Sequence, residues 1–149
     1  MSIIPSDALF ETAFSEARVS QVYLARYYLR ALELKQRGDP QPEFVPSDEE
    51  QTVNLEHILP ENSQATWPDI DHEIAAAYHR RLGNMVLIQA KKNSMIGNSA
   101  FAAKRKVLKD SGYVLTSEVA ALSTWGVKEI SERQKSLAKL AVETWPMSL

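Results

Sequence analysis

The centre of the chain carries the stretch that decides the fold, EHILP at positions 56–60, which is followed by GNMVL at 83–87 and KN at 92–93. Residues 52–55 alternate apolar and polar side chains, which predicts a short strand that delivers the first two residues of EHILP at its end. GNMVL continues into Ile88 and has the apolar, β-branched content of a buried strand. The predicted order is therefore strand, strand and helix, carrying a His, an Asn and a second Asn.

Segments with helical spacing surround this centre. Apolar residues recur at helical intervals near the N-terminus, and Gly38 followed by Asp39-Pro40 ends that run. We expect helices over 6–37 with a break near Ser20 left open, over 71–82 ending at Gly83, over 99–112 capped by Ser99, and from Ser123 or Thr124 to about Trp145.

The length and composition indicate an ordinary globular protein. A chain of 149 residues can bury one core, and its apolar and charged content is average. We expect a helical lead-in with an acidic, Pro-containing loop over 1–50 and a core with C-terminal helices over 51–149. Together these segments would form one compact domain, mainly α with a small β-hairpin.

Charge is distributed unevenly along the chain, although the formal net charge is only -2. From Ile74 to Lys109 there is no Asp or Glu, but there are eight Lys and Arg residues; removing these from the total of 17 leaves nine against all 19 acids, or -10 elsewhere. Lys and Arg neutralise DNA phosphates, so the centre of the chain is the expected nucleic-acid surface.

Several classes of protein are excluded or disfavoured. The chain has no cysteine, which rules out disulfides and zinc sites that use Cys. The N-terminus lacks the pattern of a secretory signal, and no apolar run is long enough to span a membrane. A soluble, cytoplasmic protein without a membrane partner is expected.

The ordered motifs EHILP, LGNMVL and KKN resemble the ββα-metal (HNH, His-Me finger) nucleases, and most closely the C-terminal domain of GmrSD-type modification-dependent restriction endonucleases. That family usually continues with Gly-Asn, an aromatic residue and a Lys, then a Trp and an Arg. The matching residues here are Gly97-Asn98, Phe101 and Lys104, then Trp125 and Arg133. The resemblance implies a ββα-metal core embedded in a helical domain.

The chemistry of phosphodiester hydrolysis requires an activated water and stabilisation of charge on the phosphorane and leaving oxygen. His57 is suited to take a proton from water near neutral pH, so we assign it as the general base. By resemblance, Asn84 fixes the loop and the orientation of His57, while Glu56 and Asn93 supply oxygen ligands to one Mg²⁺ or Mn²⁺. HNH enzymes often have Asp where this chain has Glu56, so its longer side chain must reach the metal differently.

The resemblance also implies DNA, with or without base modification, as substrate. Lys91, Lys92, Lys104 and Arg105 are the residues expected to hold flanking phosphates. In the family an NTPase-like domain or subunit directs cleavage, and this chain contains no Walker-type Gly-rich loop that would supply it. Such a regulatory domain or subunit would lie outside this sequence, which could be a fragment of a larger protein, a stand-alone subunit or half of a split system.

Simpler interpretations remain for each residue. His57 could be a hydrogen-bonded residue at a strand end, Asn84 a helix cap, Asn93 a turn residue and the basic run at 104–109 a solvated helix face. His72 and His79 are expected to be exposed or to cap a helix, and the three Trp residues to anchor the core. The alternative function is a catalytically silent module that binds DNA or other subunits.

Overall fold

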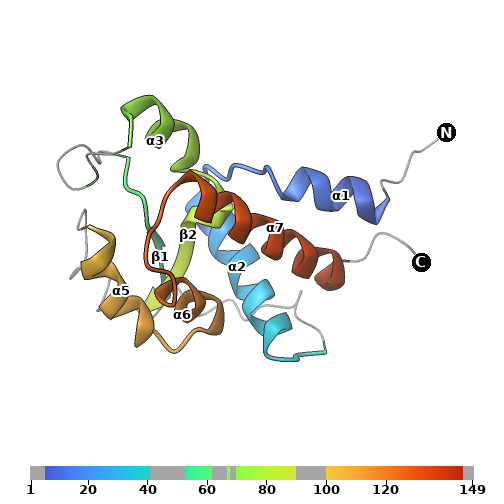
Figure 1. Cartoon of the computed structure of the whole chain (residues 1–149). Helices are drawn as coiled ribbons and strands as arrows, with labels where there is room; N and C mark the ends of the chain where they lie inside the picture. Colours follow the sequence, from blue (N-terminus) through green and yellow to red (C-terminus); the bar gives the residue numbers. More distant parts are fainter. Residues whose placement is uncertain (1–5, 41–52, 62–66, 68–69, 90–99, 146–149) are drawn as a thin grey trace.

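The computed structural model describes residues 6–40, 53–61, 67, 70–89 and 100–145, and it is mostly helical with one two-stranded sheet (Figure 1). The elements are α1 (Asp7–Phe14), α2 (Val22–Gln36), β1 (Val53–His57), α3 (His72–Tyr78), the 3-10 turn η1 (Leu82–Asn84), β2 (Met85–Gln89), α5 (Phe101–Lys109), α6 (Val114–Ala120) and α7 (Val127–Thr144). The prediction of a mainly α domain with a small β-hairpin is confirmed. Within the described residues, no helix combines the length and apolarity that a membrane crossing requires.

The two strands pair antiparallel, with Glu56 opposite Val86 and His57 opposite Met85. Side chains alternate between the faces of a strand, so the sheet separates two clusters of buried side chains. Met85 and Leu87 belong to a cluster that also contains residues of α2 and α7, whereas Val86 belongs to one with Phe101 and Trp125. The predicted strand that ends at Glu56 and His57 is confirmed.

The N-terminal segment folds as two helices rather than one. Between them the backbone of Val19 donates to the carbonyl of Arg80 at 2.8 Å, and Arg18 pairs with Arg81 as an isolated bridge. The backbone of this connection therefore hydrogen-bonds to a distant segment instead of continuing a helix. Phe14 of α1 and Leu29 of α2 are buried in the same cluster as Met85, so the lead-in and the sheet share a core.

The helix expected over 71–82 is shorter, because α3 ends at Tyr78. The prediction that this helix ends at Gly83 is wrong, because Gly83 lies in the 3-10 turn before β2. A Cβ at this position would lie 2.4 Å from the carbonyl oxygen of Ile130 and 2.9 Å from Cβ of Gln134. The residue is glycine because α7 lies directly against its backbone.

Helix α6 was not predicted from the sequence. Its first backbone amides are held by Glu33 of α2, whose carboxylate accepts from Val114 N at 2.8 Å and from Leu115 N at 2.9 Å. Such a cap normally comes from a neighbouring residue, but here it comes from another helix. The predicted helix over 99–112 is α5, and its predicted cap Ser99 lies outside the described residues.

Candidate active site

His57 lies at the end of β1, and its ring stacks on the ring of His79, which follows α3. The ring centroids are 4.2 Å apart and the planes differ by 21°. His79 is also tied to the loop after His57, since its Nδ1 lies 3.0 Å from the carbonyl oxygen of Leu59. The prediction that His79 is an exposed or capping residue is confirmed, because His79 is the C-cap of α3. The structure adds that its ring lies beside the candidate base.

The environment of His57 favours the neutral imidazole. Burial, followed by the charges of His79, Lys104 and Arg80, lowers the pKa of His57 to about 4. The ring is therefore uncharged at neutral pH, as a group that accepts a proton must be.

Asn84 is fully buried and holds the backbone two residues beyond His57. Its Oδ1 accepts from Leu59 N at 2.8 Å and from Trp125 Nε1 at 3.0 Å. Its Nδ2 donates to the carbonyls of Leu59 at 3.0 Å and His79 at 2.9 Å. Asn84 thus joins the end of the His57 loop to the end of α3, and its contacts with the His57 ring are indirect.

The turn that presents Asn84 is held by α7. Arg133 Nη1 donates to the carbonyls of Gly83 at 3.0 Å and Met85 at 2.7 Å, and Gln134 Oε1 accepts from Gly83 N at 3.0 Å. Trp125, which donates to Asn84, stacks on Phe101 of α5 at a centroid distance of 5.8 Å. The Trp, Arg and aromatic residue of the sequence pattern therefore converge on the Gly83-Asn84 turn or its neighbours.

Glu56 faces α5 and forms a buried ion pair with Lys104. Lys104 is 0% exposed, and its Nζ donates to Glu56 Oε1 at 3.0 Å and to the carbonyls of His57 at 3.0 Å and Ile58 at 2.7 Å. Burial raises the pKa of Glu56 and lowers the pKa of Lys104. The opposite charge of the partner, and the hydrogen bond between them, partly offset both shifts. The pair joins α5 to the residues around His57.

The prediction that Lys104 holds a DNA phosphate is therefore wrong for this arrangement. An ammonium group offers three donors, and all three are directed at interior acceptors. Arg105 is partly buried, and its Nε donates to the carbonyl of Ala120 at 3.2 Å. Lys91, Lys92 and Asn93 lie outside the described residues.

The described residues provide one carboxylate that suits a hard cation. Glu56 is buried, its Oε1 is already paired with a positive charge, and no described residue hydrogen-bonds to its Oε2. Carboxylate oxygen is a ligand that Mg²⁺ and Mn²⁺ prefer, so this donor fits the expected ion. In the described ranges, no three or more His, Cys, Asp or Glu side chains lie close enough together to hold a metal ion. Further ligands would therefore come from outside those ranges.

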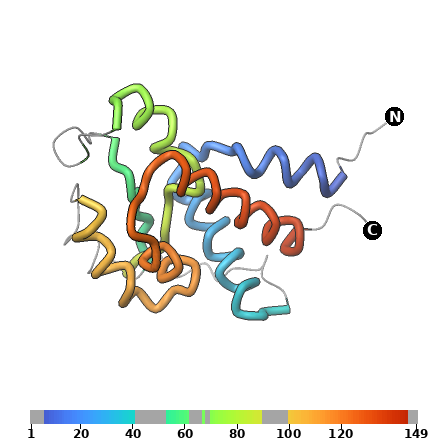
Figure 2. Tube along the Cα trace, viewed as in Figure 1, coloured from blue at the N-terminus to red at the C-terminus, as the bar shows by residue number. Residues whose placement is uncertain are grey.

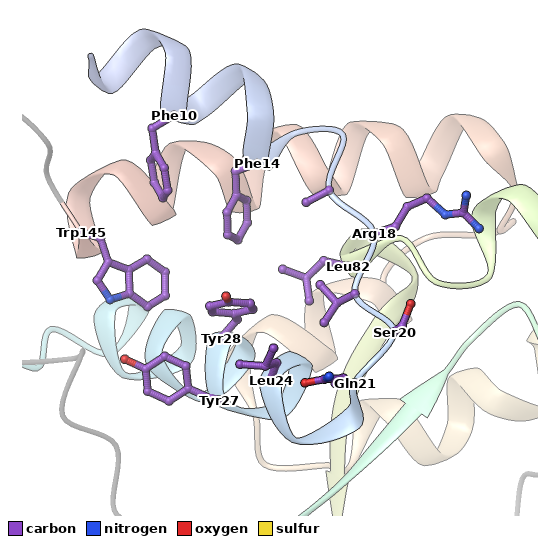
Figure 3. A pocket seen from close by; sticks show the side chains of 12 residues that line it. Phe10, Phe14, Arg18, Ser20, Gln21, Leu24, Tyr27, Tyr28, Leu82 and Trp145 are labelled. Carbon is purple, nitrogen blue, oxygen red and sulfur yellow. The ribbon is translucent and has the colours of Figure 1, made fainter. Parts of the chain in front are cut away.

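A hollow of about 600 Å³ lies at a different place, between α1, α2 and the end of α7 (Figure 3). The rings of Phe14, Tyr28 and Trp145 face it, together with other apolar side chains. Of the predicted catalytic and metal residues that the structure describes, which are His57, Asn84 and Glu56, none lines it. Helices α1 and α7 lie towards one side of the molecule, whereas β1, α3 and α5 lie towards the other (Figure 2).

His79 is the residue that sequence reasoning missed. The available signal was its position five residues before Asn84, in the segment that leads into the second strand. That spacing says nothing about the partner of the ring, because His57 is 22 positions away along the chain.

Comparison with known proteins supports the motif-based resemblance. No curated protein matches the chain. A family model described as the C-terminal domain of GmrSD restriction endonucleases matches residues 4–140, which is nearly the whole chain. The match includes both strands, the Gly83-Asn84 turn and every described helix up to most of α7. The chain therefore belongs to the family of GmrSD restriction endonuclease C-terminal domains.

Proposed function

We propose that this chain is an HNH-type endonuclease domain that hydrolyses DNA phosphodiester bonds in the restriction of foreign or modified DNA. The observation that carries the proposal is the convergence of two buried polar groups on the backbone after His57. Asn84 binds both backbone groups of Leu59, and Lys104 binds the carbonyls of His57 and Ile58. This arrangement holds a neutral imidazole at the end of a strand, next in sequence to the buried carboxylate of Glu56.

In the proposed reaction His57 accepts a proton from a water molecule. The water oxygen forms a bond to phosphorus, and the bond from phosphorus to the 3′ oxygen breaks. The departing oxygen takes a proton from solvent. A neutral His57 is needed at the start of this step, and the lowered pKa of His57 supplies that form at neutral pH.

Glu56, with Asn93, is proposed to hold one divalent ion, Mg²⁺ or Mn²⁺. When bound, the ion would stabilise the negative charge on the phosphorane and on the leaving oxygen. Lys104 keeps Glu56 in place and limits its rotation, because Nζ is bonded to two backbone carbonyls as well as to Oε1. This function for Lys104 replaces the phosphate contact expected from the sequence.

The DNA path is proposed to follow the basic segment from Ile74 to Lys109. Arg80, Lys106 and Lys109 are exposed there, and Lys91, Lys92 and Arg105 remain candidates for contacts with flanking phosphates. Base-modified DNA as substrate and an NTPase-like regulatory partner are also part of the proposal, and both rest on the motif resemblance. The family match itself supports a restriction endonuclease domain.

The test is nicking of supercoiled plasmid, alongside hydroxymethylated and glucosylated DNA, in Mg²⁺, Mn²⁺ or EDTA. Wild type should cut only with metal, and His57→Ala should lose at least about a hundredfold in rate, because it lacks the proton acceptor. His72→Ala is the matched control, since His72 is an exposed His on the neighbouring α3. Equal cutting by His57→Ala would refute the assignment of the base, and DNA binding without any cutting would favour the silent module.

A further inference from the structure

We propose that His79 is a positioning residue that holds the His57 imidazole in one orientation by ring stacking, while its own Nδ1 is anchored to the carbonyl of Leu59. The inference deepens the proposed function and rests on it for the part concerning cutting. It assigns a task to a side chain that the sequence motifs do not include.

Stacking is the contact that the described residues provide for the His57 ring. Among the described residues no hydrogen bond reaches either ring nitrogen of His57, whereas the His79 ring lies 4.2 Å away and nearly parallel. A catalytic imidazole usually has one nitrogen oriented by an acceptor, which leaves the other nitrogen for the reaction. Here a flat surface lies against one face of the ring and restricts its rotation.

His79 can perform this task because its own position is determined twice. Its Nδ1 lies 3.0 Å from the carbonyl oxygen of Leu59, and its backbone carbonyl accepts from Asn84 Nδ2 at 2.9 Å. The same Asn84 nitrogen donates to Leu59 O at 3.0 Å. Asn84, Leu59 and His79 thus form a closed bracket, and the bracket sets the distance between the two imidazole rings.

The bracket explains how Asn84 can influence His57 without touching its ring. Asn84 fixes the end of α3 relative to the His57 loop, and His79 carries that constraint to the imidazole. A change at His79 should therefore alter the position of His57 while leaving the proton acceptor and the Glu56–Lys104 pair in place. Misplacement of a reacting group by about 1 Å can cost about a hundredfold in rate.

The experiment compares His79→Ala, which removes ring and anchor, with His79→Phe, which keeps a ring for stacking, and with His72→Ala as the exposed control on α3. The first readout is the ¹H–¹³C NMR signal of the His57 Cε1–H group in the metal-free chain. The second is kcat and KM for plasmid nicking with Mn²⁺. Thermal unfolding of each variant ensures that folded protein is compared.

We expect His79→Ala to move the His57 signal, to lower kcat by about ten- to a hundredfold, and to leave KM within about twofold. His79→Phe should retain more activity than His79→Ala, and His72→Ala should match wild type. An unmoved His57 signal, or a kcat for folded His79→Ala within about twofold of wild type, overturns the proposal. If His79→Ala does not fold, His79→Phe decides: a His57 signal near its wild-type position supports stacking, and a displaced signal opposes it.

The two readouts also separate this inference from the proposed function. If wild type cuts no DNA under any metal condition, the endonuclease proposal fails and the NMR signal alone decides whether His79 positions His57. If wild type cuts and His79→Ala cuts equally, the endonuclease stands and the positioning task is refuted.

Discussion

Asn84 and Gln134 are two buried amides that flank the same glycine, yet they serve different parts of the molecule. Both are 0% exposed, and each makes four hydrogen bonds through its side chain. Asn84 binds Leu59, His79 and Trp125, around the candidate active site. Gln134 binds Arg81 and Gly83 through Oε1, and the carbonyls of Phe14 and Ala17 through Nε2.

The same side-chain amide thus has two uses: at Asn84 it holds the loop that carries the candidate base, and at Gln134 it connects two segments of the chain. Every donor and acceptor of both amides is used, so neither can be removed without leaving buried groups unsatisfied. The partners of Gln134 lie at the end of α1 and in the turn before β2, so it connects the N-terminal lead-in to the core. The partners of Asn84 surround the loop that carries His57.

Gly83→Ala should have the largest effect on folding, because it disturbs the hydrogen bonds of Asn84 and those of Gln134 together. The added Cβ would lie 2.4 Å from the carbonyl oxygen of Ile130, and neither backbone can move without displacing α7. We expect little or no folded protein, as measured by circular dichroism and thermal unfolding. Gly38→Ala is the control for expression and handling, since a Cβ there meets no atom within 4 Å, although its φ of 87° makes it mildly strained.

Asn84→Ala should reduce nicking by about a hundredfold or more per folded molecule, because the bracket that joins Leu59 to His79 is lost. It should also lower the free energy of unfolding by roughly 2–4 kcal/mol, since the Leu59 amide and the Trp125 indole lose their acceptor. Rates are measured on plasmid and normalised to the folded fraction. Unchanged nicking would mean that the loop keeps its shape without Asn84.

Gln134→Ala should separate stability from activity. We expect the free energy of unfolding to fall by roughly 3–5 kcal/mol, because two carbonyls, an amide and the Arg81 guanidinium lose a buried partner. The rate per folded molecule should stay within about threefold of wild type. Urea unfolding and nicking at low temperature provide the measurements. A loss of rate as large as that of Asn84→Ala would show that the two amides act as one unit.

Lys104→Met extends the comparison to a buried cation. It leaves the Glu56 carboxylate without its ammonium partner, so the free energy of unfolding should fall by roughly 3–5 kcal/mol, and Glu56→Gln in addition should recover part of the loss. The salt dependence of DNA binding should not change, because the buried Nζ contacts no phosphate. A flatter salt dependence would show that Lys104 does contact DNA phosphates.

The titration of His57 needs no substitution and tests the environment that the Asn84 bracket provides. Because its folded pKa of about 4 lies below the unfolded value near 6.5, the folded state binds fewer protons between these pH values. The contribution of His57 to stability is therefore complete above pH 6.5 and is lost as pH falls towards 4. NMR titration of the metal-free chain should give a midpoint near 4. A midpoint near 6.5 would mean that the ring is solvated.

Much of the fold followed from local pattern. The alternation before EHILP predicted β1, because period-2 patterning reflects which face of a strand is buried. The apolar run after Gly83 predicted β2, because a short continuous apolar run is typical of a buried strand. Helical periodicity predicted α7, and the cap signal at Ser99 predicted α5; the apolar faces of both helices lie in the core. Local pattern failed at α6, where the capping carboxylate comes from Glu33, more than 80 positions away.

The strands, the main helices, the candidate base His57 and the family could be predicted from the sequence, since these depend on residue types at short spacing. Three features are visible only once the elements are packed: His79 stacks on His57, Lys104 is buried against Glu56, and α7 requires glycine at position 83. Each of these contacts joins residues 22 to 51 positions apart. Which partner satisfies a buried polar group depends on how the elements pack, and that information is not contained in the spacing of any one motif.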